Sequence, residues 1–319
     1  MSEIRFRSIR FPRGDVFTKA ADTPKVPLPP QGQEDTVDTS GLKRFWLDLP
    51  YGGKSQAQNL ALFLPNEGAG PFPLVILIHG GGFLFGDKFM SLDALLRPCL
   101  AQGFAVASVN YRLSGEAKFP AAIEDVKTAV RYLKASSERY SLNPERFALW
   151  GESSGGNLAA LAGTTHRTTA FVDACAGYPD VSTQVAAVVD FCGPIDFLTM
   201  DDQFTVNGLD GQNHNSPDSF ESLYLGAPIA TVPWLVKQSD PQTYLAPGGC
   251  PPFLIEHGTK DENIPYQQSV IFSQKLLSAL DADKVNLRLL DGATHCSSAF
   301  ESDENIAFTL AFLKKYLDG

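Results

Sequence analysis

The sequence predicts an α/β fold built on a mostly parallel, doubly wound sheet of about eight strands. Short apolar runs alternate with helical patterns along most of the 319 residues, which is the order that produces such a sheet. Two Gly-rich turns, at residues 79–83 and 151–156, each follow an apolar run directly. Because these sheets carry their chemistry beyond the carboxyl ends of the strands, both turns are candidate functional sites.

The expected strands divide into an edge pair and a buried set. Residues 43–49 and 58–64 alternate partly between apolar and polar side chains, which suits an antiparallel edge pair joined by the turn at 51–54. Residues 74–78 and 104–109 are continuously apolar, as in parallel strands that are covered on both faces. Four further strands are expected at residues 146–150, 186–191, 253–256 and 285–290.

The expected helices follow from apolar spacing. Residues 123–133 carry apolar side chains three and four positions apart, which predicts an amphipathic helix. Residues 157–162 predict a helix of small side chains, directly after the second Gly-rich turn. The other expected helices cover about 91–101, 265–280 and 303–317.

Two segments depart from this alternation. Residues 1–41 contain five prolines and show neither the helical nor the strand spacing of apolar residues. We therefore expect an extended arm here, followed by one domain at 42–319. Residues 197–245 contain no clear strand but are rich in aromatic residues. A connection this long is usually functional or forms small helices of its own, and we expect a cap over the active end of the sheet. The alternative is an irregular surface excursion with ordinary aromatic content.

The run Gly151-Glu152-Ser153-Ser154-Gly155 fits the pattern G-x-S-x-G between a strand and a helix. A serine at such a turn is held in a strained backbone geometry with its hydroxyl pointing out of the sheet, and this is the nucleophile elbow of hydrolases. The pattern alone is weak, because Gly and Ser are common in loops. The flanking strand and helix give it value and make Ser153 the candidate nucleophile.

The run His79-Gly80-Gly81-Gly82-Phe83 predicts an oxyanion hole. Three glycines allow a tight turn that aims backbone N–H groups into a cavity, where they stabilise the negative charge that develops in acyl transfer. A flexible turn and a phosphate-binding loop are the alternatives. The phosphate-binding loop lacks support, because neither the Lys-Ser/Thr of a P-loop nor the pattern G-x-G-x-x-G is present here.

A serine nucleophile requires a base, and the chain offers five histidines: His79, His166, His214, His257 and His295. We favour His295 over His214, because His295 follows the last expected strand at the active end of the sheet.

The base in turn requires a carboxylate, and Asp261 lies after the strand at 253–256, in the chain order Ser, Asp, His. Glu262 is the rival acid, Asp291 is disfavoured, and Asp261 could instead cap the following helix.

Several motifs together resemble the carboxylesterase type of α/β-hydrolase. The chain is similar to hormone-sensitive-lipase-like esterases and more so to the bifunctional acetyl/feruloyl esterase domain family. The matching runs are His79–Phe83, Asn110–Leu113, Phe119–Ala122, Glu124–Val126, Gly151–Asn157, His257–Asp261 and Gly292–His295. The resemblance implies an α/β-hydrolase fold, a Ser153-Asp261-His295 triad, and the backbone N–H groups of Gly81, Gly82 and Ser154 as oxyanion donors.

Two departures separate the chain from the lipase-like group. Glu152 and Ser154 stand where those relatives often carry Asp and Ala, and the acid motif is His-Gly-x-x-Asp, which favours the feruloyl/acetyl branch. Arg112, Glu124 and Asp125 are expected to form a structural charge network.

The aromatic residues offer candidates for the substrate pocket. Phe83, Phe85, Trp234 and other aromatics of 197–245 are the candidates, each equally suited to the core.

Composition excludes several classes of function. A net charge of −10 argues against nucleic acid and against an anionic membrane surface. The five cysteines form no C-x-x-C pair, so neither a zinc ribbon nor a redox pair is indicated, and Cys99 and Cys192 read as packed thiols. The charged N-terminus lacks an apolar signal region, and no apolar stretch approaches 18 residues, so a cytoplasmic protein is expected.

The sequence therefore predicts a serine hydrolase that cleaves small-molecule carboxylic esters through an acyl-enzyme, with no metal or organic cofactor required. One alternative is an amidase or peptidase of the same fold, such as an arylformamidase. A second is a binding protein without catalytic activity. The sequence does not set the oligomeric state, and a homodimer is one of the assemblies considered.

Overall fold

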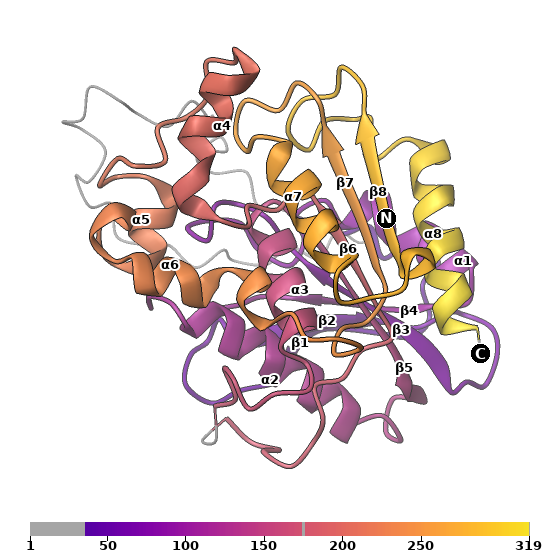
Figure 1. The fold of residues 1–319 in the computed structure, drawn as a ribbon. Helices are drawn as coiled ribbons and strands as arrows, with labels where there is room; N and C mark the ends of the chain where they lie inside the picture. Colours follow the sequence, from indigo (N-terminus) through magenta and orange to yellow (C-terminus); the bar gives the residue numbers. More distant parts are fainter. Residues whose placement is uncertain (1–35, 174–175, 319) are drawn as a thin grey trace.

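Figure 1 shows the fold in a computed structural model, which describes residues 36–173 and 176–318. Among these residues, eight strands form one sheet in the order β1-β2-β4-β3-β5-β6-β7-β8. β1 pairs antiparallel with β2, and β2 with β4, whereas the other neighbours run parallel. The expected doubly wound sheet with an antiparallel edge pair is confirmed.

Each strand lies where an apolar run predicted it. The strands are β1 (Phe45–Pro50), β2 (Asn59–Phe63), β3 (Phe72–Ile78), β4 (Ala105–Val109), β5 (Leu142–Glu152), β6 (Ala187–Phe191), β7 (Phe253–Gly258) and β8 (Val285–Leu290). β3 and β5 begin earlier than expected, because Phe72 pairs with Leu142 and its N–H donates to the carbonyl of Ser141 at 2.7 Å. Polar residues between Leu142 and Phe147 hide this extension in the sequence pattern.

Helices cover both faces of the sheet, and the side chains of each strand alternate between them. α1 (Leu92–Ala101) and α8 (Asp303–Leu317) pack on the face that receives Val75 and Leu77. The opposite face, which receives Leu74 and Ile76, is covered by α2 (Ala121–Ala135), α3 (Ser154–Thr164) and α7 (Gln267–Leu276). A short η5 (Ala282–Lys284) precedes β8.

Residues 197–245 form short helices, and within this fully described segment no strand occurs, as its pattern predicted. They are η2 (Phe197–Thr199), α4 (Met200–Asn207), α5 (Phe220–Leu225), η3 (Ile229–Thr231), α6 (Pro233–Ser239) and η4 (Pro241–Tyr244). In Figure 1, α4, α5 and α6 lie to the left of the sheet. An extended arm was expected at residues 1–41, and residues 1–35 of it lie outside the described part of the chain.

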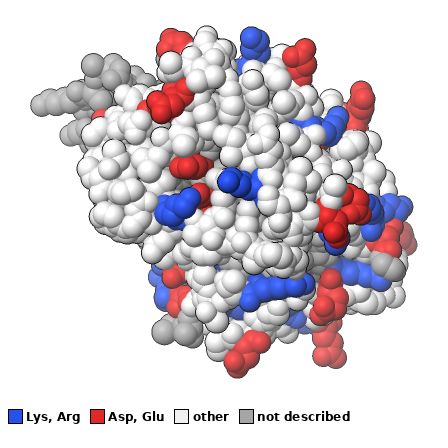
Figure 2. All heavy atoms as spheres, viewed as in Figure 1, with Lys and Arg blue, Asp and Glu red and all other residues white. Residues whose placement is uncertain are grey.

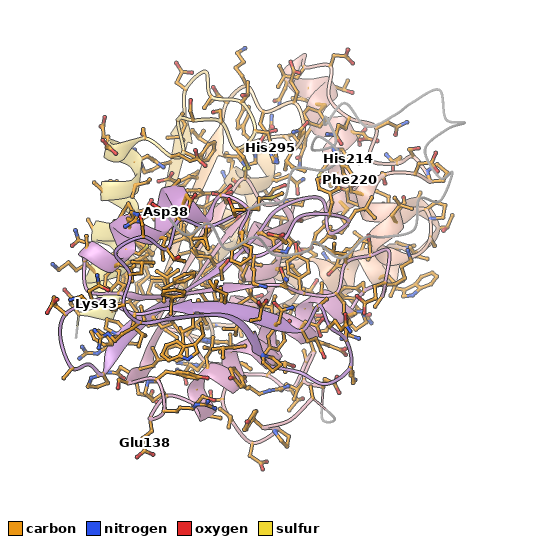
Figure 3. All side chains as sticks on the ribbon, turned by 180° about the vertical axis from the view of Figure 1, so that it is seen from behind. Asp38, Lys43, Glu138, His214, Phe220 and His295 are labelled. Atoms are coloured by element: carbon orange, nitrogen blue, oxygen red, sulfur yellow. The ribbon has the colours of Figure 1, made fainter. Side chains whose placement is uncertain are left out.

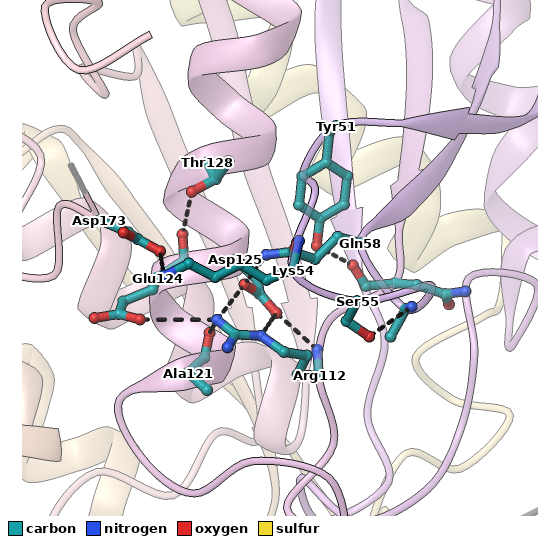
Figure 4. A network of polar contacts seen from close by, with 12 residues as sticks. Tyr51, Lys54, Ser55, Gln58, Arg112, Ala121, Glu124, Asp125, Thr128 and Asp173 are labelled. Carbon is teal, nitrogen blue, oxygen red and sulfur yellow. Dashed lines mark hydrogen bonds and ion pairs between the residues drawn. The ribbon is translucent and has the colours of Figure 1, made fainter. Parts of the chain in front are cut away.

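A buried charge network fixes the start of α2 against the neighbouring loops (Figure 4). Asp125 is 1% exposed and receives the guanidinium of Arg112 through Nε at 2.8 Å and Nη2 at 2.7 Å. Gln58 donates to the same carboxylate at 2.6 Å, and Arg112 lies 3.7 Å from Glu124. None of these residues is among those that line the cavity described below, which agrees with a structural network.

The surface carries both signs of charge. On the described part of the face shown in Figure 2, Lys and Arg side chains are interspersed with Asp and Glu and form no continuous basic patch. Within residues 36–173 and 176–318, no helix is both long and apolar enough to cross a bilayer.

Candidate active site

The turn between β5 and α3 presents Ser153 at the carboxyl edge of the sheet. Ser153 has φ 54° and ψ −122°, a region that residues with a side chain rarely adopt. A Cβ on Gly151 would collide with the carbonyl of Gly155, and a Cβ on Gly155 would collide with that of Ile78. Both glycines are therefore required for the close approach of α3 to β5 and β3.

Ser153, His295 and Asp261 form one chain of hydrogen bonds. His295 Nε2 lies 2.9 Å from Ser153 Oγ, and His295 Nδ1 lies 2.6 Å from Asp261 Oδ2. Since an ionised carboxylate only accepts, Nδ1 carries the proton and Nε2 offers its lone pair to the serine hydroxyl. The three side chains come from the ends of β5, β7 and β8, which the parallel sheet brings to a single edge.

The surroundings of Asp261 keep its carboxylate ionised. The side chain is 0% exposed, and its Oδ1 accepts the backbone N–H groups of Asn263 at 2.8 Å and Ile264 at 2.9 Å. Burial alone would raise the pKa of Asp261, but the charge of His295 and hydrogen bonds from His257 and His295 hold it below its usual value. Burial conversely opposes the charge on His295, while Asp261 raises the pKa of this imidazole and makes it a stronger proton acceptor.

The rival carboxylates lie outside this chain. Glu262 is exposed, and Asp291 accepts a hydrogen bond from Thr259 Oγ1 at 3.2 Å.

His257 is a site residue that the sequence did not single out. It is 0% exposed, and its Nε2 lies 3.2 Å from Asp261 Oδ2 and 3.0 Å from the carbonyl oxygen of Ile264. Both of these oxygens only accept, so Nε2 carries the proton, and Nδ1 accepts from Ser269 Oγ at 2.7 Å. His257 is therefore in a position to orient the carboxylate of Asp261. The i,i+4 spacing in His-Gly-x-x-Asp was its only signal.

The Gly-rich turn after β3 lines the same cavity as Ser153. Gly81 and Gly82 have φ 106° and 59°, and a Cβ on Gly82 would lie 2.6 Å from the ring of Phe220. The side chain of His79 holds the turn in place. Its ring stacks on Tyr111 with centroids 4.4 Å apart, and its Nδ1 donates to the carbonyl of Gly80 at 2.8 Å. Burial lowers the pKa of His79 to about 4, so this ring is neutral at pH 7.

Ser154 supplies the first N–H of α3, directly after Ser153 in the chain. The first N–H groups of a helix have no partner within the helix and carry the positive end of its dipole. Gly81, Gly82 and Ser154 all line the cavity. Their backbone N–H groups are thus candidate donors for an oxyanion next to Ser153.

Aromatic and polar side chains both line the cavity. Phe85 meets Phe220 edge to face, with centroids 5.6 Å apart, and both line the cavity. Figure 3 shows Phe220 and His214 on the same side of the molecule as His295. Glu152 also lines the cavity, and burial together with nearby Glu301 raises the pKa of its carboxyl to about 7.

Two of the expected pocket aromatics behave differently. Phe83 borders the cavity, but it is only 1% exposed and stacks on Tyr224 with centroids 3.9 Å apart, so it is mainly a core residue. Trp234 lies on α6, is 60% exposed, and is absent from the cavity lining. The structure corrects the expectation for Trp234, because α6 turns this side chain toward solvent.

His214 and His166 have other partners. His214 Nδ1 lies 3.0 Å from Glu221 Oε2, and its Nε2 lies 2.9 Å from the carbonyl oxygen of Asn263. His166 Nε2 lies 3.1 Å from the carbonyl oxygen of Gly249, and its Nδ1 accepts the N–H of Val185 at 3.3 Å. Neither ring is hydrogen-bonded to Ser153 in this arrangement.

Comparison with known proteins gives relatives that are named as esterases. Esterase LipC of Mycobacterium tuberculosis is 30% identical over 226 residues, which cover 70% of this chain and 53% of LipC. A probable isoprenylcysteine alpha-carbonyl methylesterase of rice, ICMEL1, is 29% identical over 76% of this chain and 55% of that protein. The chain spans about half the length of these curated relatives.

A solved structure covers the fold more completely. It is described as a truncated form of carbohydrate esterase from gut microbiota, is 27% identical, and superposes with a TM-score of 0.78 over 87% of this chain and 98% of that chain. The family model described as BD-FAE matches residues 60–276, which is more than half of the sequence. The chain is therefore an α/β-hydrolase that belongs to the BD-FAE family.

Proposed function

We propose that this protein is a serine hydrolase that cleaves small-molecule carboxylic esters through an acyl-enzyme intermediate. The observation that carries the proposal is the hydrogen-bond chain from Ser153 Oγ through His295 to buried Asp261, with distances of 2.9 and 2.6 Å. This chain opens into a cavity that Gly81, Gly82 and Ser154 also line. The relatives named as esterases support the same reaction class.

In the acylation half-reaction, Ser153 Oγ attacks the ester carbonyl while its proton passes to His295 Nε2. Asp261 stabilises the imidazolium that forms and keeps Nδ1 protonated. The carbonyl oxygen becomes an oxyanion, which accepts hydrogen bonds from the N–H groups of Gly81, Gly82 and Ser154. The tetrahedral intermediate then collapses, and His295 gives its proton to the departing alkoxide, which leaves as the alcohol.

Deacylation repeats these steps with water. The oxygen of a water molecule attacks the acyl carbon while His295 Nε2 takes a proton from that water. The same N–H groups stabilise the second oxyanion. Collapse of this intermediate returns the proton from His295 to Ser153 Oγ and releases the carboxylic acid. No step requires a group beyond the side chains and backbone amides named.

Residues 197–245 act in this proposal as a cap that forms one wall of the substrate pocket. Gln212, His214 and Phe220 come from this segment and line the cavity together with Ser153, which supports that role. The arm at 1–41, the cytoplasmic location and the homodimer stay predictions.

Turnover assays separate this proposal from its alternatives. We expect hydrolysis of p-nitrophenyl acetate with a burst of p-nitrophenol, loss of turnover in Ser153→Ala, and slower cleavage of a matched N-formyl aryl amide. Faster cleavage of the amide would favour an arylformamidase. No turnover of either substrate by the wild-type protein would favour a binding protein and overturn the proposal.

A further inference from the structure

Two cysteines that are far apart in the sequence meet directly beside His295. Cys192 Sγ lies 3.2 Å from Cys296 Sγ, although 104 residues separate them. Cys192 follows β6 and is 0% exposed, which confirms that it is a packed thiol, whereas Cys296 is exposed and lines the cavity with Ser153. The pair is therefore buried on one side and reachable from the substrate cavity on the other.

His295 completes a cluster of three residues that can each offer a ligand atom to a metal ion. One ligand atom from each of Cys192, His295 and Cys296 lies within 4.8 Å of the other two. His295 Nδ1 is held by Asp261, so Nε2 is the ring nitrogen with an available lone pair. Thiolate and imidazole ligands select d10 ions such as Zn²⁺ and Cd²⁺ over Mg²⁺ and Ca²⁺, which prefer oxygen ligands.

The spacing of the two sulfurs is nearer to that of a metal-bound pair than to that of a disulfide. With Zn–S bonds of 2.3 Å, two thiolates of a tetrahedral site lie roughly 3.8 Å apart. The 3.2 Å pair would have to open by about 0.6 Å to hold such an ion, but to close by more than about 1 Å to reach the disulfide bond length of about 2.05 Å.

We propose that Cys192, Cys296 and His295 form a binding site for a thiophilic divalent cation, which enters through the substrate cavity and blocks hydrolysis. The two thiols release their protons to solvent, and two thiolate lone pairs and the lone pair of His295 Nε2 bind the ion, so no oxidant is needed. His295 Nε2 then no longer accepts the proton of Ser153. Binding is independent of the proposed function, whereas the inhibition rests on it.

Cadmium is the probe, because its thiolate complexes have a charge-transfer band in the ultraviolet. Reduced wild-type protein and Ser153→Ala are titrated with Cd²⁺, with absorbance and calorimetry as readouts. We expect one equivalent of Cd²⁺ with a thiolate-to-cadmium band in both proteins, and inhibition of wild-type ester hydrolysis at the same concentrations. Because Ser153→Ala cannot form an acyl-enzyme, its titration tests the site even if the proposed function is wrong.

Cys296→Ser and Cys192→Ser remove one thiolate each. We expect either change to weaken Cd²⁺ binding at least tenfold. The Cd²⁺ concentration that halves the esterase activity, measured relative to the metal-free activity of the same variant, should rise by the same factor. Cys250→Ser is the matched control, because Cys250 is a buried thiol outside the cavity lining, and this variant should bind as the wild type does. An absent band in the wild type, or an undiminished band in Cys296→Ser, would overturn the proposal. The proposal would also be overturned if peroxide removed two thiols and the protein bound no Cd²⁺. That result would indicate that the two cysteines form a disulfide instead.

Discussion

Two histidine–carboxylate pairs border the same cavity, and only one of them is arranged as a base. His295 lies 2.6 Å from Asp261, and His214 lies 3.0 Å from Glu221. The far nitrogen of His295 faces the hydroxyl of Ser153, which donates, whereas the far nitrogen of His214 faces a backbone carbonyl, which only accepts. His214 must therefore donate from both nitrogens.

The pKa of His214 agrees with this geometry. Burial opposes its charge, but the carboxylate of Glu221 and the hydrogen bond to it raise the pKa of the imidazole. The ring therefore holds the segment 212–221 against Asn263, and neither of its nitrogens faces a hydroxyl that could give up a proton. A histidine beside a carboxylate is thus not sufficient for catalysis, and the partner of the second ring nitrogen decides the role.

The largest expected effect separates the two histidines by activity. We expect His295→Ala to lower kcat for p-nitrophenyl acetate by about 10⁴-fold or more, as removal of a triad member does in serine hydrolases. His214→Gln, in contrast, is expected to keep kcat within about tenfold, because no proton passes through its ring. Steady-state kinetics on folded protein measures both, and equal losses would contradict the comparison.

The second expected effect separates them by stability. His214→Ala leaves Glu221, which is 3% exposed, as a buried charge without its partner. Breaking a buried ion pair in this way costs about 3–5 kcal/mol of the free energy of unfolding. Urea denaturation measures the loss. The double change His214→Ala/Glu221→Gln should recover part of it, and a fully additive loss would argue against the pair.

His257 tests whether a third histidine supports the base through its acid. We expect His257→Leu to lower kcat by about ten- to hundredfold with little change in KM, since a hydrogen bond to a charged group contributes about 1.5–3 kcal/mol. His257→Gln retains an N–H donor and should restore part of the loss. A merely structural role would lower stability without this rescue of kcat.

A buried histidine without a carboxylate provides the pH contrast. Burial lowers the pKa of His166 to about 4, below the unfolded value of 6.5, so the unfolded chain binds more protons between these pH values. His166 therefore lowers stability as the pH falls from 6.5 to 4, by about 2 kcal/mol between pH 7 and 5. Denaturant titrations at pH 7 and pH 5 measure this loss of unfolding free energy. The loss should be smaller in His166→Gln than in the wild type, and an equal loss would contradict the lowered pKa of His166.

The smallest expected effect concerns the corrected pocket residue. Trp234 is 60% exposed on α6 and does not line the cavity. We expect Trp234→Ala to change kcat/KM less than about twofold and stability by less than about 0.5 kcal/mol, as surface substitutions usually do. Phe220→Ala is the comparison variant, because its ring does line the cavity and should alter kcat/KM.

The sequence predicted most of the fold and named the residues of the candidate site around Ser153, because both depend on local patterns. Apolar runs located all eight described strands, and the Gly-rich turns at 79–83 and 151–156 identified the loops at the active edge. Contacts made by folding were not predictable in this way. Cys192 and Cys296 meet only because β6 and β8 end at the same edge, and the exposure of Trp234 depends on the rotation of a short helix.

The most direct test is to locate the serine that a fluorophosphonate probe modifies. The probe reacts only with a serine whose hydroxyl is activated by a base, and mass spectrometry of the digested protein identifies the modified peptide. We predict a single adduct on Ser153 in the wild type and in His214→Gln, and no adduct in His295→Ala. Labelling at another residue, or undiminished labelling of Ser153 without His295, would contradict the account.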